Sequence, residues 1–307
     1  MNAKRLVMAG GSGFIGRALA ADFAAHGYEV VVLTRSPRQR RDNIQEVAWD
    51  GAQIGSWSSA LDGAGAVINL TGKNINCPHT PENLRDITAS RVNSVKVLAT
   101  AIGQAKVPPR VWVQASAVGF YGDTQAAASD ENSPAGTDSL ATVCREWEGA
   151  FVAADLKQTR KVVLRIGFVL GRDGGALPLL SKLTRYFLGG AVGSGRQYIS
   201  WIHLADLTAM FATAVASEQM SGTYNAVAPK PVTNAEFMRE LRRILHRPWS
   251  PPAPEFAVKL GAKLMGSEPS LALISQRCVP KRFQEIGFQF KFNDVTAALN
   301  DLCAKRP

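Results

Sequence analysis

Residues 5–26 read RLVMAGGSGFIGRALAADFAAH, and this segment decides the fold class. It begins with an apolar strand pattern and ends with a helical pattern, and glycines separate the two. Gly10 permits a tight turn, Gly13 lets a phosphate approach the backbone, and Gly16 allows the helix to pack closely on the strand. The free N–H groups and the dipole at the start of the helix favour an anion. The segment therefore predicts a strand, loop and helix that bind the pyrophosphate of a dinucleotide. The alternative is a turn with a purely structural role.

The same alternation of strands and helices continues through the first half of the chain. Short β-branched apolar runs predict strands at residues 5–8, 29–33, 66–70, 111–114 and 162–166, and the stretches between them predict helices at 14–26, 80–106 and 140–156. Strands that are apolar on both faces and separated by helices are typical of a parallel sheet covered on both sides. We therefore predict an α/β fold, a Rossmann-like doubly wound parallel sheet, with ligands along the edge where the strands end.

The regular alternation of predicted strands and helices ends after about residue 170. Glycine and proline interrupt the chain, and helices are predicted at residues 204–217, 234–246, 255–265 and 293–304. We expect residues 1–170 to form the dinucleotide-binding domain, to which residues of about 196–228 return. Residues 171–195 and 229–307 are expected to form a smaller, mostly helical C-terminal cap that carries the substrate region.

The end of the second predicted strand indicates which dinucleotide binds. An NAD enzyme usually presents Asp or Glu at this position to the ribose hydroxyls. Here the strand ends in Thr34 and Arg35, and Arg38, Arg40 and Arg41 follow. Because a guanidinium pairs well with a phosphate, the sequence predicts NADP rather than NAD. For the last three arginines a solvated basic loop is the alternative.

Composition excludes several other classes of protein. The chain is 46% hydrophobic and 20% charged, which is ordinary for a globular protein, and no apolar run approaches the roughly 18 residues of a membrane span. The net charge of +10 is spread along the chain rather than gathered in the stripe that nucleic-acid binding needs. The four cysteines form no CxxC pair and show no metal-ligand spacing with histidine. We expect a soluble, cytoplasmic protein with a small-molecule substrate and no metal, nucleic-acid or membrane partner; an oligomer is left open.

Several motifs together resemble the extended short-chain dehydrogenase/reductase (SDR) superfamily, which includes NAD-dependent epimerases and dehydratases. The glycine loop is similar to its TGxxGxxG motif, and Asn69 to Gly72 (NLTG) resembles the turn that lies against the adenosine. Arg91-Val92-Asn93 is similar to a helix segment whose Asn supports the active site, and residues 116–122 (SAVGFYG) resemble the stretch that ends in Tyr-Gly. Further stretches resemble the atypical "epimerase family" subgroup, which carries a C-terminal domain of unknown function: Trp147-Glu148, residues 172–176, residues 199–203 and the tail from Asn234 to Phe288.

The glycine loop, the end of the second strand and this resemblance together give one set of predicted cofactor-binding residues. The set is Gly10, Gly11, Ser12, Gly13, Phe14, Ile15, Gly16, Thr34, Arg35, Leu70, Thr71, Gly72, Arg91 and Asn93.

The catalytic pattern of the superfamily is incomplete in this chain. The resemblance implies a Tyr-x-x-x-Lys pair with an upstream Ser or Thr, but Val143 and Trp147 stand at about the positions of the pair. The hydroxyl position falls on Ala117, and Ser116, one residue earlier, points to the opposite face of a regular strand unless a bulge intervenes. The predicted catalytic residues are therefore the substitutes Ser116 and Tyr121. For Tyr121 a packed aromatic with a polar tip is the competing interpretation.

Other polar residues near these motifs receive mainly structural interpretations. We expect Cys144 to be a small buried residue and Glu148 to make a helix-surface or capping contact; for each, a role as a substitute catalytic group is the alternative. His203 and Asp206 are expected to be structural, with Asp206 favouring the dipole in the first turn of a helix. Arg165 either binds an anionic substrate or is a buried, paired arginine.

Two functions remain open on the sequence. The first is an NADP-dependent oxidoreductase or epimerase-like enzyme that acts on a small molecule held between the sheet edge and the cap. Because the cofactor carries the electronic chemistry, hydride transfer can proceed without the usual tyrosine. The second is a catalytically silent protein that binds NADP for sensing or regulation.

Overall fold

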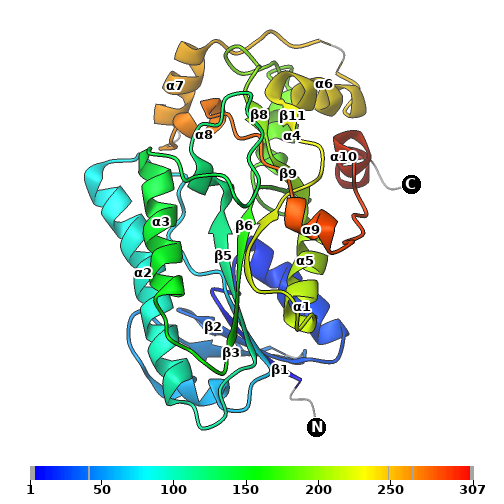
Figure 1. Cartoon of the computed structure of the whole chain (residues 1–307). Coiled ribbons are helices and arrows are strands. Elements are labelled where there is room, and N and C mark those ends of the chain that lie inside the picture. The colour runs from blue at the N-terminus through cyan, green and yellow to red at the C-terminus, as the bar shows by residue number, and fades with distance from the viewer. Residues whose placement is uncertain (1–3, 41, 248, 265, 305–307) are drawn as a thin grey trace.

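The computed structural model describes residues 4–40, 42–247, 249–264 and 266–304. Its centre is a seven-stranded sheet with the strand order β10-β6-β5-β4-β1-β2-β3, and every neighbouring pair is parallel (Figure 1). The strands are β1 (Arg5–Ala9), β2 (Glu29–Thr34), β3 (Ile44–Ala48), β4 (Ala66–Asn69), β5 (Val111–Ala117), β6 (Arg160–Ile166) and β10 (Gly222–Ala226). The predicted Rossmann-like doubly wound sheet is confirmed.

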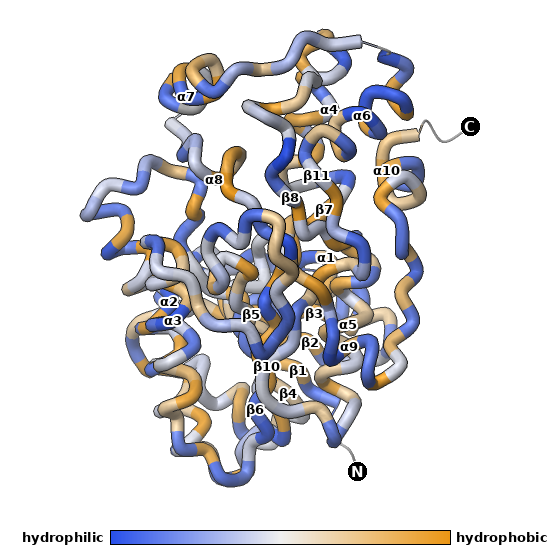
Figure 2. Tube along the Cα trace, turned by 45° about the horizontal axis from the view of Figure 1, so that its top comes forward, coloured by the Kyte–Doolittle hydropathy of each residue, from blue (hydrophilic) through white to orange (hydrophobic). Residues whose placement is uncertain are grey.

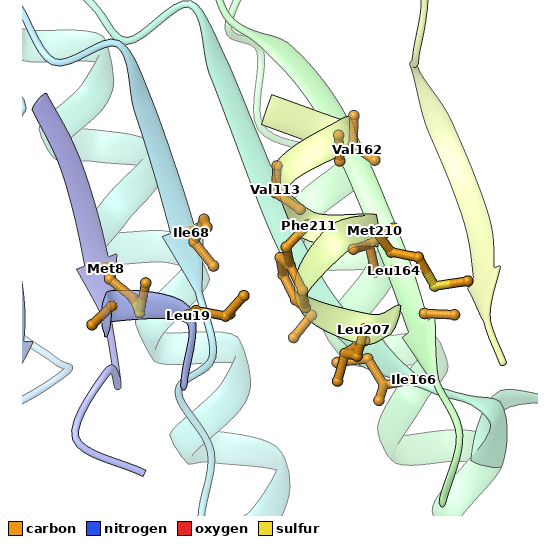
Figure 3. Packing of buried hydrophobic residues seen from close by; sticks show 14 of the residues in the cluster. Met8, Leu19, Ile68, Val113, Val162, Leu164, Ile166, Leu207, Met210 and Phe211 are labelled. Carbon is orange, nitrogen blue, oxygen red and sulfur yellow. The ribbon is translucent and has the colours of Figure 1, made fainter. Parts of the chain in front are cut away.

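Helices cover both faces of this sheet, as its apolar strands require. One face carries α1 (Phe14–Ala25) and α5 (Leu204–Ala216), and the other carries α2 (Pro81–Gln104) and α3 (Ser139–Val152) (Figure 1). Figure 3 shows the packing on the first face, where Leu19 of α1 and Leu207, Met210 and Phe211 of α5 lie against the strands. On the second face the Trp112 and Phe151 rings meet edge to face with centroids 4.7 Å apart.

Most of the rest of the chain builds a cap beyond the carboxyl ends of the strands (Figure 1). Short strands pair in two further two-stranded sheets, β7 (Phe168–Leu170) with β9 (Trp201–His203) and β8 (Tyr198–Ile199) with β11 (Val232–Thr233). The helices are α4 (Leu177–Arg185), α6 (Asn234–Ile244), α7 (Glu255–Leu264), α8 (Ser270–Leu273), α9 (Lys281–Glu285) and α10 (Val295–Cys303).

The end of the chain returns to the sheet layer. The α9 residue Phe283 is fully buried, with its ring centroid 5.2 Å from that of Tyr224 in β10. The buried Asp206 carboxylate of α5 accepts hydrogen bonds from the backbone N–H groups of Lys291 (2.8 Å) and Phe292 (3.0 Å). These contacts fix the C-terminal segment against the side of the sheet that α5 covers.

The predicted strands and helices are all observed, with differences at their ends. The helix predicted at 80–106 spans Pro81–Gln104, and the one predicted at 140–156 spans Ser139–Val152. The two outermost strands of the sheet, β3 and β10, were not among the predicted strands. No helix in the described part of the chain is both long enough and apolar enough to cross a membrane.

Candidate cofactor and active site

The glycine loop has the geometry that the sequence predicted. Gly10 has a φ of +72°, and a Cβ at this position would lie 2.9 Å from the Thr71 backbone nitrogen. A Cβ on Gly16 would lie 2.5 Å from the Gly11 Cα. At Gly13 the nearest atom is the Gly10 carbonyl oxygen, 3.8 Å away, so the space in front of Gly13 is open. Because Gly13 is the N-cap of α1 and no side chain caps the helix, the first N–H groups are left for an anion, and the loop fits a pyrophosphate.

The side chain of Phe14 holds a second loop over the start of α1. A Cβ on Gly171 or Gly174 would overlap the Phe14 ring, and a Cβ on Gly175 would lie 3.3 Å from it. The segment after β7 can therefore pack on this ring only because it carries glycines. Phe14 belongs to the predicted cofactor-binding set, and its ring has this packing role.

The carboxyl end of β2 meets the glycine loop. The Thr34 hydroxyl donates a hydrogen bond of 3.2 Å to Ser12 Oγ, and Arg35 follows with an exposed side chain. Arg40, by contrast, is paired with Asp42 and with Glu46. Arg41 lies outside the described residues. Within the described ranges Arg35 has no ion-pair partner, so its charge is available to a ligand.

The turn after β4 is fixed by a buried amide. The Asn69 amide donates to Ser94 Oγ (3.2 Å) and to Gln114 Oε1 (3.0 Å), and its oxygen accepts the Thr71 N–H at 3.0 Å. The Thr71 Oγ1 is buried and has no hydrogen-bond partner among the described residues. Because Thr71 borders Gly10, this hydroxyl is a polar group left for a ligand at the loop.

Two predicted cofactor residues on α2 have different surroundings from those expected. Arg91 donates to the carbonyls of Lys73 and Ile87, both at 3.0 Å, and its guanidinium lies 5.0 Å from the Trp147 ring. A Cβ on Gly72 would lie 2.8 Å from the guanidinium carbon, so Arg91 covers that glycine. Asn93 is exposed, and its neighbour Ser94 is the residue that reaches the sheet. The supporting role of Asn93 stays a prediction.

The two predicted catalytic residues belong to one buried network. Ser116 Oγ donates to Glu148 Oε1 at 2.6 Å. Arg165 donates to both oxygens of Glu148, at 2.9 and 2.8 Å, and to the Tyr121 hydroxyl at 2.9 Å. Tyr121 in turn donates to Asn225 Oδ1 at 2.7 Å. The network joins β5, the 3₁₀ helix Val118–Tyr121, α3, β6 and β10.

The structure corrects the expected role of Glu148 and decides between the two interpretations of Arg165. The expectation of a helix-surface or capping contact for Glu148 is wrong, because only 7% of the residue is exposed and both oxygens bind partners inside. Arg165 is the buried, paired arginine that was one of its two interpretations. Its guanidinium also lies over the Phe120 ring, 3.4 Å from the centroid.

Burial and charge set the protonation of the network. Burial raises the pKa of Tyr121 to about 12, although the Arg165 charge and hydrogen bond lower it. Burial would lower the pKa of Arg165, but the hydrogen bond and charge of Glu148 outweigh it and the pKa is raised. Burial also raises the pKa of the Cys144 thiol to about 12, and the Glu148 charge adds to this. Tyr121 and Cys144 therefore keep their protons at neutral pH, and Cys144 is the buried residue that was expected.

The α3 positions that correspond to the superfamily pair are apolar and packed. Val143 and Trp147 are each 5% exposed. The Trp147 indole nitrogen is buried without a hydrogen-bond partner among the described residues. Strand β5 keeps its register with β6 through Ser116 and Ala117, so no bulge brings Ser116 to the face of Ala117. The regular strand instead directs Ser116 to Glu148 on α3.

His203 and Asp206 have structural roles, as expected, but with different partners. His203 Nδ1 accepts the Ala205 N–H at 3.0 Å and so caps α5, and its ring stacks on Phe292 with centroids 3.9 Å apart. Burial lowers the pKa of His203 and raises that of Asp206. Asp206 binds the backbone of residues 291 and 292, a contact between distant segments that the helix-dipole argument did not include.

Comparisons with known proteins show which family the chain resembles along most of its length. The model of the "NAD dependent epimerase/dehydratase family" matches residues 6–226, and that of a domain of unknown function (DUF1731) matches residues 253–302. The "Epimerase family protein SDR39U1 homolog, chloroplastic" of Arabidopsis thaliana is 38% identical over 94% of this chain and 84% of its own. The "Epimerase family protein YfhF" of Bacillus subtilis is 33% identical over 98% of each chain.

A solved structure extends the similarity to three dimensions. The crystal structure of the human epimerase family protein SDR39U1 (isoform 2) with NADPH has a TM-score of 0.87 and 32% identity, and covers 97% of this chain and 98% of its own. The family match, over residues 6–226, spans the glycine loop and all of the parallel sheet except Arg5. The chain belongs to the NAD dependent epimerase/dehydratase family and carries the C-terminal DUF1731 domain.

Proposed function

We propose that the chain is a cytoplasmic NADP(H)-dependent oxidoreductase or epimerase-like enzyme that acts on a small molecule. The observation that carries the cofactor assignment is the unpaired, exposed Arg35 directly after β2, where an NAD enzyme presents a carboxylate. A guanidinium at this position favours the additional phosphate of NADP. The NADPH in the human relative supports the same cofactor.

The chain's own groups divide the work of holding the cofactor. The N–H groups that follow Gly13 would bind the pyrophosphate, and Arg35 would bind the adenosine phosphate. The unpartnered Thr71 hydroxyl would complete its hydrogen bonding on the bound nucleotide. When bound, the cofactor supplies the hydride or accepts it.

Tyr121 is the residue that we assign to the proton. With a pKa of about 12 it is a neutral phenol, and it can donate a proton but does not act as a ready phenolate. Its hydroxyl would turn from Asn225 to the substrate oxygen, and Arg165, 2.9 Å from the phenol oxygen, would stabilise the phenolate that remains. Ser116 would position Glu148 rather than contact the substrate, since its proton is donated to that carboxylate.

A second function, a silent NADP(H)-binding sensor or regulator, is favoured by one specific observation. The hydroxyl protons of both Ser116 and Tyr121 are donated to partners inside the protein. Val143 and Trp147 stand where the superfamily carries its acid and its lysine. On this reading the same cofactor site operates without turnover.

Binding is tested first, with a matched pair of variants. Arg35→Asp is expected to weaken NADPH binding at least about tenfold while leaving NADH binding nearly unchanged, because a charged hydrogen bond contributes about 1.5–3 kcal/mol. Arg38→Asp makes the same charge change three residues along the same exposed loop and should have a much smaller effect. Isothermal calorimetry with both dinucleotides gives two affinities for each protein, one for NADPH and one for NADH. Equal losses from the two variants would assign the effect to the charge of the loop rather than to Arg35.

Turnover is tested next by following NADPH oxidation with panels of aldehydes, ketones, quinones and nucleotide sugars. Turnover that disappears in Tyr121→Phe and persists in Tyr28→Phe, a ring packed on Phe23 in the α1 layer, would support the enzyme. Tight NADPH binding without turnover across the panels would favour the silent binder.

A further inference from the structure

Exposed apolar side chains gather on one part of the cap. Of the twelve large hydrophobic residues that are exposed in the described part of the chain, eight belong to residues 179–188 and 249–264. They are Leu179, Tyr186, Phe187, Leu188, Trp249, Phe256, Leu260 and Leu264. We name this surface, together with the charged residues of segments 179–188 and 247–264, the cap patch. Surface patches of this kind on a protein mark interaction sites.

The two segments of the cap patch meet at Arg247. Arg247 Nε donates to the Arg185 carbonyl at 3.0 Å, and its guanidinium lies 5.1 Å from the Phe187 ring. A few residues further along, Val192 and Ala253 form a parallel bridge. Helix α7 begins at Glu255, directly after this bridge, and lies at the end of the molecule away from the amino terminus (Figure 2). The cap patch therefore follows the chain from the contact of Arg247 with Phe187 to α7.

Helix α7 contributes a narrow apolar stripe to the cap patch. Phe256, Leu260 and Leu264 recur every four residues, so they share one side of the helix, and they are 73%, 58% and 81% exposed. Lys259 and Lys263 are exposed on the same helix. An apolar stripe flanked by lysines is the pattern of a helix that lies in the plane of a membrane interface.

The backbone at Phe187 favours a role for its ring outside the protein. Phe187 has a φ of +62° and follows α4 at a position where glycine is usual, and its N–H bonds the Thr184 carbonyl as the chain leaves the helix. A bulky side chain in this conformation is strained. Burial within the protein offsets this strain only in part, since Phe187 is 50% exposed.

The charge of the cap patch selects the partner. Residues 179–188 and 247–264 contain five basic side chains and one acidic side chain: Lys182, Arg185, Arg247, Lys259 and Lys263 against Glu255. A second copy of the same surface would be repelled by this charge, whereas an anionic surface would be attracted. Tyrosine, tryptophan and phenylalanine beside arginine and lysine are also the side chains that gather at a lipid headgroup layer.

We propose that the cap patch docks this protein on the surface of an anionic lipid bilayer, with Phe187, Trp249 and the α7 stripe inserted at the headgroup level. The inference is independent of the proposed cofactor and enzyme. It replaces the expectation of no membrane partner, which rested on the lack of a spanning segment, because interfacial binding needs no such segment.

The test is co-sedimentation of the full chain with vesicles of 30% phosphatidylserine and 70% phosphatidylcholine, and with vesicles of phosphatidylcholine alone. We expect binding to the anionic vesicles that is at least tenfold tighter and that weakens when the salt rises from 0.1 to 0.5 M. Phe256→Ser with Leu260→Ser should reduce binding at least tenfold. The matched control, Ile54→Ser with Val107→Ser, makes the same change at exposed residues outside the cap patch and should bind as the parent does.

A second variant separates docking from folding. Phe187→Gly relieves the backbone strain, so its Tm should stay within a few degrees of the parent's while its vesicle binding falls. The proposal is overturned if the parent does not bind anionic vesicles, or if the paired serine variants of the cap patch and of the control lose binding equally. It is also overturned if the chain is a dimer in light scattering that Phe256→Ser with Leu260→Ser dissociates, because the cap patch would then be an interface between copies.

Discussion

Removing the charge of Glu148 is expected to be one of the most destabilising conservative changes in this protein. Glu148→Gln keeps the size of the side chain and one hydrogen-bond acceptor for Ser116, but leaves the Arg165 guanidinium without its counter-charge. Side-chain exposures of 6% for Arg165 and 10% for Glu148 place both charges away from water. Loss of one partner from a buried pair costs about 3–5 kcal/mol, because the remaining charge stays buried and uncompensated.

The same substitution at an exposed pair supplies the control. Glu82 contacts Arg85 at 3.3 Å, and their side chains are 71% and 70% exposed, so Glu82→Gln should cost less than about 0.5 kcal/mol. The free energies of unfolding come from urea denaturation followed by circular dichroism, without cofactor. Replacing both members of the buried pair, Glu148→Leu with Arg165→Met, should recover part of the loss. If Glu148→Gln and Glu82→Gln lower the free energy of unfolding equally, the view that Glu148 and Arg165 compensate each other's buried charge is refuted.

Three further changes test other parts of the site. Gly174→Ala places a methyl group on the Phe14 ring, so it should lower the free energy of unfolding by about 1–3 kcal/mol in urea denaturation and weaken NADPH binding. The control Gly149→Ala adds a methyl group in open space on α3 and should be neutral or stabilising. Equal effects of the two changes would contradict the packing role of Phe14. Thr71→Val removes a buried hydroxyl that has no partner among the described residues, so the Tm of the free protein should stay the same or rise, while calorimetry should show weaker NADPH binding. An unchanged affinity would show that this hydroxyl does not bind the cofactor. Burial lowers the folded-state pKa of His203 below its ordinary 6.5, so the unfolded chain takes up the proton first and stability should fall as the pH drops through about 6.5. His203→Asn keeps a capping side chain that does not titrate, and its stability should fall less between about pH 7 and 5.5; the same slope as the parent's would assign the pH dependence to other groups.

Local pattern was sufficient for the centre of the fold and for the glycine loop. The inner strands are apolar on both faces, and a loop with glycines at positions 10, 13 and 16 has few other geometries open to it. The edge strands gave a weaker signal for a physical reason. Strand β3 reads IQEVA and exposes part of one face, and β10 reads GTYNA with a glycine at its start. The place of β10 in the sheet is set by pairing with β6, about 60 positions earlier in the chain, whereas β3 pairs with β2, which is close in sequence.

The candidate active site was harder to predict, because its contacts join distant segments. Ser116 and Glu148 are separated by 32 positions, and Tyr121 and Asn225 by 104. A glutamate on a helix is usually exposed, so nothing local distinguished Glu148 from a surface residue. A useful signal was the arginine within the apolar strand β6, since a charge in a buried strand requires a counter-charge nearby.

Because the buried Asp206 carboxylate binds the backbone of residues 291 and 292, we expect the two stretches matched by separate family models to unfold as one cooperative unit. A chain that ends at residue 226 would leave the Asp206 carboxylate buried without its hydrogen-bond donors. It would also lack Phe283, which packs on Tyr224, and would expose one side of β10, the outermost strand. Any graft of one stretch onto a foreign partner would have to carry the other with it.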